Sequence, residues 1–421
     1  MANVSSSNGL EKRPKLRFPG FDEPWVTKRF SDLFSFLPNN TLSRADLLEG
    51  SKGNVQNIHY GDVLIKYGSI IDVESDDIPS IAQGKESKGT PYLRDGDVII
   101  ADTAEDEAVG KCCEIINVND AKVESGLHTI PCRPLASFVP MFLGYYMNSQ
   151  YYHKQLFPLM QGVKVLSISK SNIGKTHFSA PSSHFEQKKI VEMLHLIDLR
   201  ISKQQHIIEV LKKYKRGVVR TLLTPDSCCI AGATWTTAKI GDLGSFTKGA
   251  PLSKADISPD GTPFILYGEL YTTYHEVINA VIRRTQAQPE KQYYSRVGDV
   301  IIPTSGETPE EISTAACVML PDIILAGDLN IFRSSKIDGR IMSYILNHIV
   351  NGQIARIAQG KSVVHIQANE LSKIEISYPD YNTQCKMIKI FDALNARTEI
   401  AQKKLMALRC IQKALLQQLF I

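Results

Sequence analysis

The chain of 421 residues repeats itself at a spacing of about 200 residues. Gln161-Gly162 returns as Gln359-Gly360, and Pro181 returns as Pro379, each 198 residues later. A chain built as two similar halves presents two similar surfaces, which suits a partner with two similar sites, such as a bipartite stretch of DNA. Further matching positions are Tyr146 with Tyr344, Gln155 with Gln353, Trp25 with Trp235, Asp32-Leu33 with Asp242-Leu243, and residues 95–100 with residues 297–302.

Length and composition set the broad class. A chain of this length suits two or three domains, and 43% hydrophobic with 22% charged residues is typical of a soluble globular protein. The net charge of +4 permits nucleic-acid binding without indicating it. The eight cysteines form no C-x-x-C pair, which favours reduced thiols over a zinc site or disulfides. With no apolar run of about 18 residues and a polar start, we expect a cytoplasmic protein whose residues 1–15 form a mobile tail.

Each half begins with short strand-like runs between turn residues and then changes to helical periodicity. The Gln-Gly pair should close the helix of each half, because glycine suits the left-handed position after a helix end. The expected strands include Val63-Leu64-Ile65, Val98-Ile99-Ile100, residues 113–116, Phe264-Ile265-Leu266 and Val300-Ile301-Ile302, and the expected helices cover residues 140–160 and 340–358.

Each half ends in a long helical segment, residues 186–223 and residues 384 onward, with apolar residues at alternating steps of four and three. Matching seams favour packing of the two helices on each other, the alternative being that each helix packs on its own globular part. A helix of about 37 residues rises roughly 55 Å, farther than one small domain extends, which favours the pair. Polar residues at seam positions suit the selection of register. The seam is Ile190, Leu194, Ile197, Ile201, Gln204, Ile208, Leu211, Lys215, Val218 and Leu222, with Met387, Phe391, Leu394, Thr398, Ala401, Leu405, Leu408, Gln412, Leu415 and Leu419.

The order is therefore globular part, long helix, globular part, long helix. A parallel helix pair would require the whole second globular part to carry the chain back along the first helix, whereas an antiparallel pair gives approximate two-fold symmetry. We predict an α+β fold with two similar mixed α/β domains joined by two long antiparallel coiled-coil helices. The predicted parts are a tail (1–15), a first domain (16–184), a first spacer helix (185–224), a second domain (225–382) and a second spacer helix (383–421).

The sequence lacks the common motifs of catalysis and nucleotide binding. Gly174-Lys175-Thr176 and Gly360-Lys361-Ser362 resemble the end of a phosphate-binding loop, but Ser169 and Ala355 stand where that loop needs glycine. There is no G-x-S-x-G elbow and no histidine pair at zinc-ligand spacing, and the acidic residues 102–107 are typical of a solvated loop. An Asn-Pro-Pro-aromatic or Asp-Pro-Pro-aromatic tetrapeptide for an extruded base is also missing. We expect no catalytic residue and no metal.

Several segments, in this order and with this duplication, resemble the specificity subunit of type I restriction–modification systems. The resemblance covers nearly the whole chain from Leu16, although the second long helix is poorer in acidic residues than is usual for the family. The segments that carry it are residues 16–21 with Trp25, residues 67–70 after Gly61-Asp62, residues 96–99, both Gln-Gly pairs, residues 186–190, and the helix endings 211–217 and 414–420.

This resemblance implies two target-recognition domains that each read one half of a split double-stranded DNA site, with the long helices setting the distance between them. It implies docking of two modification subunits, which carry adenine methyltransferase chemistry and bind S-adenosylmethionine, so this chain needs no cofactor. Motor and nuclease subunits can join such a complex. No membrane partner is expected.

Candidate DNA contacts follow from residue type and loop position, because loops carry function and Lys, Tyr and Ser can contact phosphates or bases. The residues after the Gln-Gly pairs are the strongest candidates, and a solvated surface side chain is the alternative for each. The candidates are Lys52, Asn54, Lys66, Tyr67, Lys85, Lys88 and Lys164 in the first half, and Lys248, Tyr267, Tyr271, Lys361 and Ser362 in the second.

Two other functional classes stay open at this point. The chain could be a two-headed protein–protein scaffold on a helical spacer without DNA binding, which the modest net charge favours slightly. It could also be a lone methyltransferase or nuclease, which the missing motifs disfavour. Basic residues of both globular parts on a common face would separate the first of these from a DNA-binding role.

Overall fold

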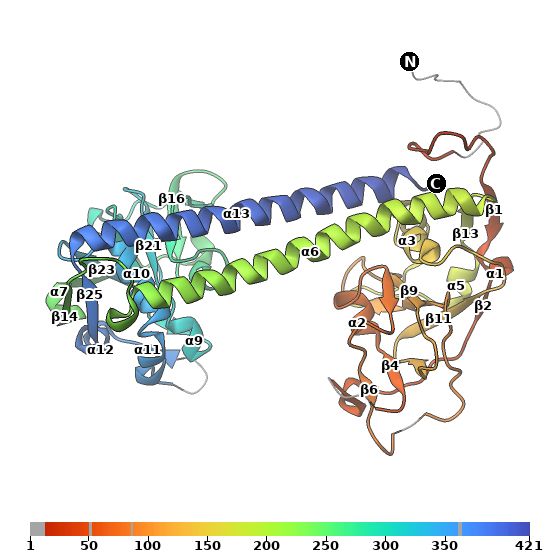
Figure 1. The fold of residues 1–421 in the computed structure, drawn as a ribbon, viewed down its shortest axis with the longest axis horizontal. Helices are drawn as coiled ribbons and strands as arrows, with labels where there is room; N and C mark the ends of the chain where they lie inside the picture. The colour runs from red at the N-terminus through yellow and green to blue at the C-terminus, as the bar shows by residue number, and fades with distance from the viewer. Residues whose placement is uncertain (1–12, 50–52, 86, 361–363) are drawn as a thin grey trace. The chain divides into compact units, whose positions relative to one another are not determined.

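Two long helices, α6 (His184–Leu222) and α13 (Tyr381–Gln418), organise the computed structural model (Figure 1), which describes residues 13–49, 53–85, 87–360 and 364–421. The chain divides into two units, Met1–Gln205 with Lys404–Ile421, and His206–Lys403. Each unit contains a head and one end of each long helix. We call residues 16–183 the first head and residues 223–380 the second head.

The first head is built on a five-stranded sheet of order β2-β11-β7-β9-β5 and a four-stranded sheet of order β10-β4-β6-β3, with the two-stranded pairs β1-β13 and β12-β8. Its strands are β1 (Val26–Arg29), β2 (Phe34–Phe36), β3 (Leu47–Leu48), β4 (Gln56–Ile58), β5 (Ile70–Asp72), β6 (Ser80–Ile81), β7 (Val98–Ala101), β8 (Thr103–Ala104), β9 (Cys112–Ile116), β10 (Val123–Ser125), β11 (Thr129–Pro134), β12 (Leu166–Ser167) and β13 (His177–Ala180). Its helices are α1 (Phe30–Leu33), α2 (Tyr60–Ile65), α3 (Phe142–Met147), α4 (Gln150–Leu156) and α5 (Lys170–Gly174).

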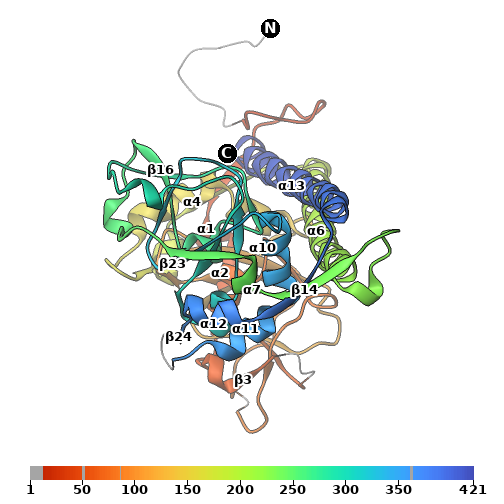
Figure 2. The same cartoon turned by 90° about the vertical axis from the view of Figure 1, so that its left-hand side faces the viewer.

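The second head repeats this plan, with a five-stranded sheet of order β15-β23-β19-β21-β17, a three-stranded sheet of order β18-β16-β22, and the pairs β14-β25 and β20-β24. The helix α10 of this head (Figure 2) packs against β19 and β21 of the five-stranded sheet. Its strands are β14 (Trp235–Lys239), β15 (Gly244–Lys248), β16 (Thr262–Leu266), β17 (Val277–Ile278), β18 (Arg283–Thr285), β19 (Asp299–Pro303), β20 (Ser305–Gly306), β21 (Ala316–Val318), β22 (Ile324–Ala326), β23 (Leu329–Ser334), β24 (Val364–His365) and β25 (Glu375–Pro379). Its helices are α7 (Ile240–Leu243), α8 (Glu269–Thr272), α9 (Pro309–Ile312), α10 (Gly339–His348), α11 (Asn351–Ile357) and α12 (Ala368–Lys373).

The repeated Gly-Asp turn has the same structural reason in both heads. Gly96 and Gly298 adopt φ of 82° and 94°, a conformation that favours glycine. The aspartate that follows is buried and forms an ion pair with an arginine of the neighbouring strand. Asp97 meets Arg133 at 2.7 Å, and Asp299 meets Arg333 at 3.0 Å. The motif therefore fixes the turn before the central strand of each five-stranded sheet. The strands that we expected at residues 98–100, 113–116, 264–266 and 300–302 are confirmed as parts of β7, β9, β16 and β19.

A buried glutamine attaches the first turn of each long helix to its head. The amide of Gln187 accepts from Val139 N at 3.0 Å and donates to Pro181 O at 3.0 Å. Gln384, 197 residues later, accepts from the backbone of residue 338 at 2.9 Å and donates to that of residue 379 at 2.8 Å. Both side chains are at most 3% exposed. The same amide thus satisfies the same two backbone groups in each half.

Within each unit the two long helices pack together in antiparallel fashion. In the first unit, the start of α6 and the end of α13 share one apolar core. In the second unit, the end of α6 and the start of α13 share another. The predicted α+β fold with two similar mixed heads and two long antiparallel helices is therefore confirmed. At every seam position named above the side chain is buried or half-buried, including the polar Gln204 and Lys215.

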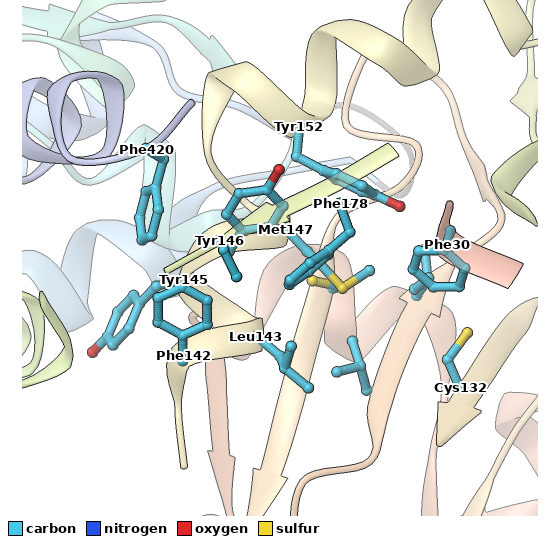
Figure 3. Packing of buried hydrophobic residues seen from close by; sticks show 14 of the residues in the cluster. Phe30, Cys132, Phe142, Leu143, Tyr145, Tyr146, Met147, Tyr152, Phe178 and Phe420 are labelled. Atoms are coloured by element: carbon cyan, nitrogen blue, oxygen red, sulfur yellow. The ribbon is translucent and has the colours of Figure 1, made fainter. Parts of the chain in front are cut away.

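The last residues of the chain complete the core of the first unit (Figure 3). The ring of Phe420 lies 6.4 Å from that of Trp25, 5.9 Å from Phe142 and 5.5 Å from Tyr146, centroid to centroid. The Tyr146 hydroxyl donates to the backbone oxygen of Ile421 at 3.2 Å. Fully buried aromatic side chains are among the largest single contributors to a core, so the two ends of the chain stabilise one unit together.

The two helices predicted to precede the Gln-Gly pairs are each broken in two, so those predictions were wrong in extent. Residues 140–160 form α3 and α4, and residues 340–358 form α10 and α11. At the first break the Asn148 amide donates to Gly144 O at 2.7 Å and to Cys112 O at 2.7 Å. Ser149 then caps α4 by accepting from Tyr152 N at 3.3 Å. Side chains that bind the backbone in this way compete with helix continuation.

The Gln-Gly pairs do not cap helices, contrary to our expectation. Gln161 exchanges two backbone hydrogen bonds with Ser167, at 2.9 and 2.8 Å, and so opens a β-hairpin. Gly162 has φ of 118°, and a Cβ atom there would lie 1.9 Å from Val165 O. Only glycine fits such a tight turn. Gln359 forms the same two bonds with His365, at 3.0 and 2.8 Å.

One predicted strand is a helix, and one repeated pair is displaced by a residue. Val63-Leu64-Ile65 ends α2, whose first turn is capped by a side-chain nitrogen of His59. Sequence spacing pairs Tyr146 with Tyr344, but contacts pair Tyr145 with Tyr344. The Tyr145 hydroxyl donates to Asp198 at 2.7 Å, whereas that of Tyr344 accepts from residue 395, which lies 197 residues beyond Asp198, at 2.8 Å.

Of the predicted tail, residues 1–12 lie outside the described residues, and the domain boundaries stay a prediction. No helix in the described part of the chain is long and apolar enough to cross a membrane.

We predict that Gln187→Ala and Gln384→Ala each lower the free energy of unfolding by about 1–3 kcal/mol, because each leaves buried backbone groups without partners. Urea unfolding at neutral pH measures the change. Gln205→Ala and Gln402→Ala, the same substitution at exposed positions of the same helices, are the matched controls and should change stability by less than about 0.5 kcal/mol. Equal effects at all four positions would contradict the anchoring role.

Candidate nucleic-acid interface

The positive charge of the chain lies on the two long helices rather than on the heads. α6 carries nine Lys and Arg against four Asp and Glu, and α13 carries seven against two. Residues 16–183 carry 16 basic and 20 acidic residues, and residues 223–380 carry 13 and 17. Each head is therefore net negative by four charges, and each long helix is net positive by five.

The basic residues of the long helices are available to a partner. All of them are exposed except Lys215. Among the described residues only Lys189 and Lys215 of this set form ion pairs, with Glu192 and Glu276. Exposed, unpaired Lys and Arg attract polyanions and acidic surfaces over about one Debye length, roughly 8–10 Å at physiological salt.

The candidates of the first head mostly surround its four-stranded sheet. Asn54 lies just before β4, and Lys85 and Lys88 follow β6; all three side chains are exposed. Lys85 pairs with Asp46 at 3.2 Å. Lys52 lies outside the described residues. Because β4 and β6 are neighbouring strands, the three exposed side chains next to them can contact one ligand.

Two further candidates of the first head are tied to the protein. Lys66 forms an ion pair with Asp77 at 3.1 Å. Tyr67 is only 5% exposed, and its hydroxyl donates to the backbone oxygen of Asp77 at 3.1 Å. Burial raises the pKa of Tyr67. A buried hydroxyl that already donates a hydrogen bond cannot reach a phosphate without rearrangement. We therefore do not propose Tyr67 as a DNA contact.

In the second head the structure brings three candidates to the same place. Lys248 donates to the Asn330 side chain at 2.8 Å, and burial lowers its pKa. Tyr271 donates to Ser305 O at 2.5 Å, and its ring meets that of Tyr267 with centroids 6.3 Å apart. Ser305 begins β20, which pairs with β24. Residues 361–363, including the candidates Lys361 and Ser362, precede β24 and lie outside the described residues.

Lys164 stands in the loop of the first Gln-Gly hairpin. It is exposed, and its neighbour Val163 is 98% exposed. The strand β8 that pairs with this hairpin leads into the acidic run Glu105-Asp106-Glu107. The acidic run weakens the attraction of this site for phosphates.

Residues 233–409, somewhat less than half of the chain, match the family model of the type I restriction modification DNA specificity domain. The fold is that of a type I restriction–modification S subunit. No curated protein matches the sequence.

Two solved structures carry the fold assignment. The S subunit of the type I restriction–modification system from M. genitalium has 15% identity and a TM-score of 0.53, and the match covers 97% of this chain and 99% of that one. A chain from a study of complex assembly and conformational transition of the type I R-M system has 15% identity and a TM-score of 0.59, covering 96% and 98%. At this identity the likeness concerns the fold, and the specificity-domain match adds sequence support for the second half.

A buried ionic cluster, which sequence analysis did not predict, joins α6 to the second head. Lys215 meets Glu276 at 2.7 Å, and His348 meets the other oxygen of Glu276 at 2.8 Å. Lys215 and Glu276 are 14% and 11% exposed. Burial acts to raise the pKa of Glu276, but its bonds to His348 and Lys215 together lower it to about 2. The only signal in the sequence was a lysine at an apolar seam position, which we assigned to register; its partner lies on the head instead.

The Arg17–Glu186 pair is a second junction that the sequence did not reveal. The Arg17 guanidinium donates to both oxygens of Glu186 at 2.8 and 2.9 Å, and Trp25 donates to the same carboxylate at 3.2 Å. Trp25 and Glu186, which both belong to the segments that carry the family resemblance, thus contact each other at the start of α6.

We predict that Glu276→Gln destabilises the second unit by about 3 kcal/mol at pH 7, since a pKa lowered from 4.5 to about 2 is worth roughly that much. The stabilisation is present above the unfolded pKa of about 4.5 and is lost as the pH falls towards 2. Urea unfolding at pH 7, 4 and 2.5 should show the difference from wild type shrinking over that range. The exposed Glu375→Gln is the matched control. A difference that does not depend on pH would contradict the ionic origin.

Proposed function

We propose that this chain is the sequence-specific DNA-binding subunit of a type I restriction–modification complex, reading a bipartite double-stranded site with its two heads. The match of residues 233–409 to a DNA specificity domain carries the proposal. The first head has the same kind of five-stranded sheet, the same Gly-Asp turn and the same glutamine anchor as the second. Two copies of one reading module suit a target with two parts.

The chain acts without bond chemistry of its own in this proposal. The solved structure from M. genitalium is of an S subunit. Docked modification subunits supply adenine methylation and bind S-adenosylmethionine, and restriction subunits can add cleavage. The complex works in the cytoplasm, where the DNA is.

The long helices are the docking surface for the modification subunits. They expose large apolar side chains beside their basic residues, among them Leu196 and Leu199 at 53% each, Ile400 at 66% and Met406 at 70%. Exposed apolar residues in such a number mark protein contact surfaces. The basic residues between them favour a partner with an acidic face.

The charge distribution separates attraction to DNA from reading of its sequence. Heads that are net negative gain little affinity from phosphates in general, so they bind DNA through a few local side chains. The local side chains that we propose are Asn54, Lys85, Lys88, Lys164 and Lys248. The basic helices supply sequence-independent attraction to the duplex. Six further residues stay predicted DNA contacts: Lys52, Lys66, Lys361, Ser362, Tyr267 and Tyr271.

A two-headed protein–protein scaffold without DNA binding is the second candidate function. The observation that favours it is the negative charge of both heads, which is unusual for a nucleic-acid reader. Binding of double-stranded DNA at physiological salt by the chain with its modification subunits separates the two functions.

We predict that neutralising Arg200, Lys203, Lys403 and Lys404 to Gln weakens binding to mixed-sequence duplex DNA. It should also reduce the slope of log affinity against log salt by about 0.9 for each phosphate that the helices no longer neutralise. Fluorescence anisotropy at several salt concentrations measures both. The control Lys373→Ala removes a lysine already paired with Glu370 and should leave the slope unchanged.

A head variant, Lys164→Ala with Lys361→Ala, belongs in the same series. If those residues touch phosphates, affinity and slope fall; if both stay constant, neither residue is at the DNA. An unchanged slope in the helix variant would contradict the attraction that we assign to α6 and α13.

We predict that four residues inserted after both His206 and Lys403 lengthen the gap between the two halves of the DNA site. Four helical residues add about 6 Å, close to two base-pair rises of about 3.4 Å. Sequencing of methylated adenines in DNA exposed to the full complex gives the gap directly. As a control, four residues inserted at Gly232, in the linker after α6, should leave it unchanged. An unchanged gap in the helix variant would contradict the ruler function.

A further inference from the structure

A cavity of about 1060 Å³ opens in the first unit, where the head faces the start of α6 and the end of α13. Its volume matches that of pockets that hold small molecules, about 300–1,000 Å³. Apolar side chains such as Ile70 and Leu416 share the lining with Ser69, Tyr145, Asp198 and Gln412. All of these belong to the first unit.

Asp198 is a largely buried carboxylate in this wall with neutral partners. It accepts from the Tyr145 hydroxyl at 2.7 Å and from the side-chain amide of Gln412. Among the described residues no lysine or arginine forms an ion pair with Asp198. Its pKa is raised, chiefly by burial. The charge of nearby His195 has a smaller effect, which lowers the pKa. Burying a carboxylate without a cation is costly, so a positive ligand would be stabilised here.

The second unit shows what occupies the matching place. There the ammonium group of Lys215 lies 2.7 Å from Glu276 and 5.6 Å from the centre of the Tyr344 ring. Carboxylate, tyrosine and ammonium thus form one cluster. The first unit has the carboxylate Asp198 and the tyrosine Tyr145, but among its described residues no lysine forms an ion pair with Asp198. Of the two lysines that line the cavity, Lys111 donates instead to Leu64 O at 2.8 Å and to Tyr67 O at 2.9 Å, and Lys413 is exposed.

The correspondence of the two places rests on the strand and helix register. Gln412 lies 197 residues after Lys215, at the matching seam position of α13. Ser69 O accepts from Glu114 N at 3.0 Å, just as Glu276 O accepts from Cys317 N at 2.8 Å, before the matching strands β5 and β17. The first unit therefore has glutamine in place of the lysine and serine in place of the glutamate, and both of these shorter side chains line the cavity.

We propose that this cavity is a binding site for an alkylammonium group. The –NH₃⁺ group lies between the Asp198 carboxylate and the Tyr145 ring, as Lys215 does beside Tyr344, and its alkyl chain lies along Ile70 and Leu416. A charged hydrogen bond and a cation–π contact both favour the bound cation. The ammonium comes either from a free polyamine or from a lysine side chain of a partner protein, and the site does not depend on the DNA-binding function.

Isothermal titration calorimetry of the full chain without DNA tests the site with three probes: 1,4-diaminobutane, an Nα-acetylated lysine amide, and the neutral 1,4-butanediol. Both amines should bind at least tenfold more tightly than the diol. Tighter binding of the diamine identifies a free polyamine as the source, and equal or tighter binding of the lysine derivative identifies a protein side chain. The proposal is overturned if neither amine binds more tightly than the diol.

Two variants place the binding at this cavity. Asp198→Asn, which copies the Asn395 of the second half, should weaken amine binding at least tenfold, whereas Asp392→Asn on α13 should change it less than twofold. Ser69→Glu with Gln412→Lys builds the chain's own ion pair into the cavity and should also weaken amine binding at least tenfold while keeping the melting temperature. If Asp198→Asn or the double variant binds the amine as tightly as wild type, the site is not there.

Discussion

The structure depends on one constraint: each head completes its core only with residues from both long helices or from the chain just beyond them. The first head needs the residues just beyond α13, where Phe420 packs against Trp25, Phe142 and Tyr146. The second needs the end of α6, where Val219, Leu222 and Leu223 share a core with the start of α13. Because burial of large side chains is the main favourable term in folding, the antiparallel pairing of the helices is a condition for both cores rather than a consequence of them.

Polar residues at the helix–head junctions make this packing specific. A glutamine in the first turn of each long helix binds the same two backbone groups of its head, and an apolar residue there would leave both unsatisfied. The seam positions Lys215 and Gln412 differ, and so do their partners. Lys215 has an ionic partner on the head, whereas Gln412 binds Asp198 on the neighbouring helix. The two halves therefore share a fold while their junctions have diverged in charge.

The sequence was sufficient where a residue type has one structural solution. The Gly-Asp turn needs positive φ and an arginine partner for the buried aspartate, and the four-three rhythm of α6 and α13 needs a helical neighbour, so both repeats could be recognised. It was insufficient where side chains compete with the backbone. Asn148 and Ser149 end α3 and start α4 through bonds that no periodicity reports. Gly162 was expected at a helix end because glycine suits both a helix end and a hairpin, and only the bonds of Gln161 to Ser167 decide between them.

For the candidate DNA contacts, the sequence was insufficient for a different reason. Residue type and loop position selected Tyr67, but the fold buries it, and only coordinates give burial. Net charge of +4 concealed two acidic heads and two basic helices, a division that could be counted only once the helices had bounds. The division has a physical consequence for a reader of DNA. A head with excess negative charge loses affinity for every sequence equally, so the free-energy difference between two sequences is unchanged while its local contacts account for a larger share of the remaining binding. In the proposed function, the helices attract the duplex to the heads, while the heads bind it only through their local contacts.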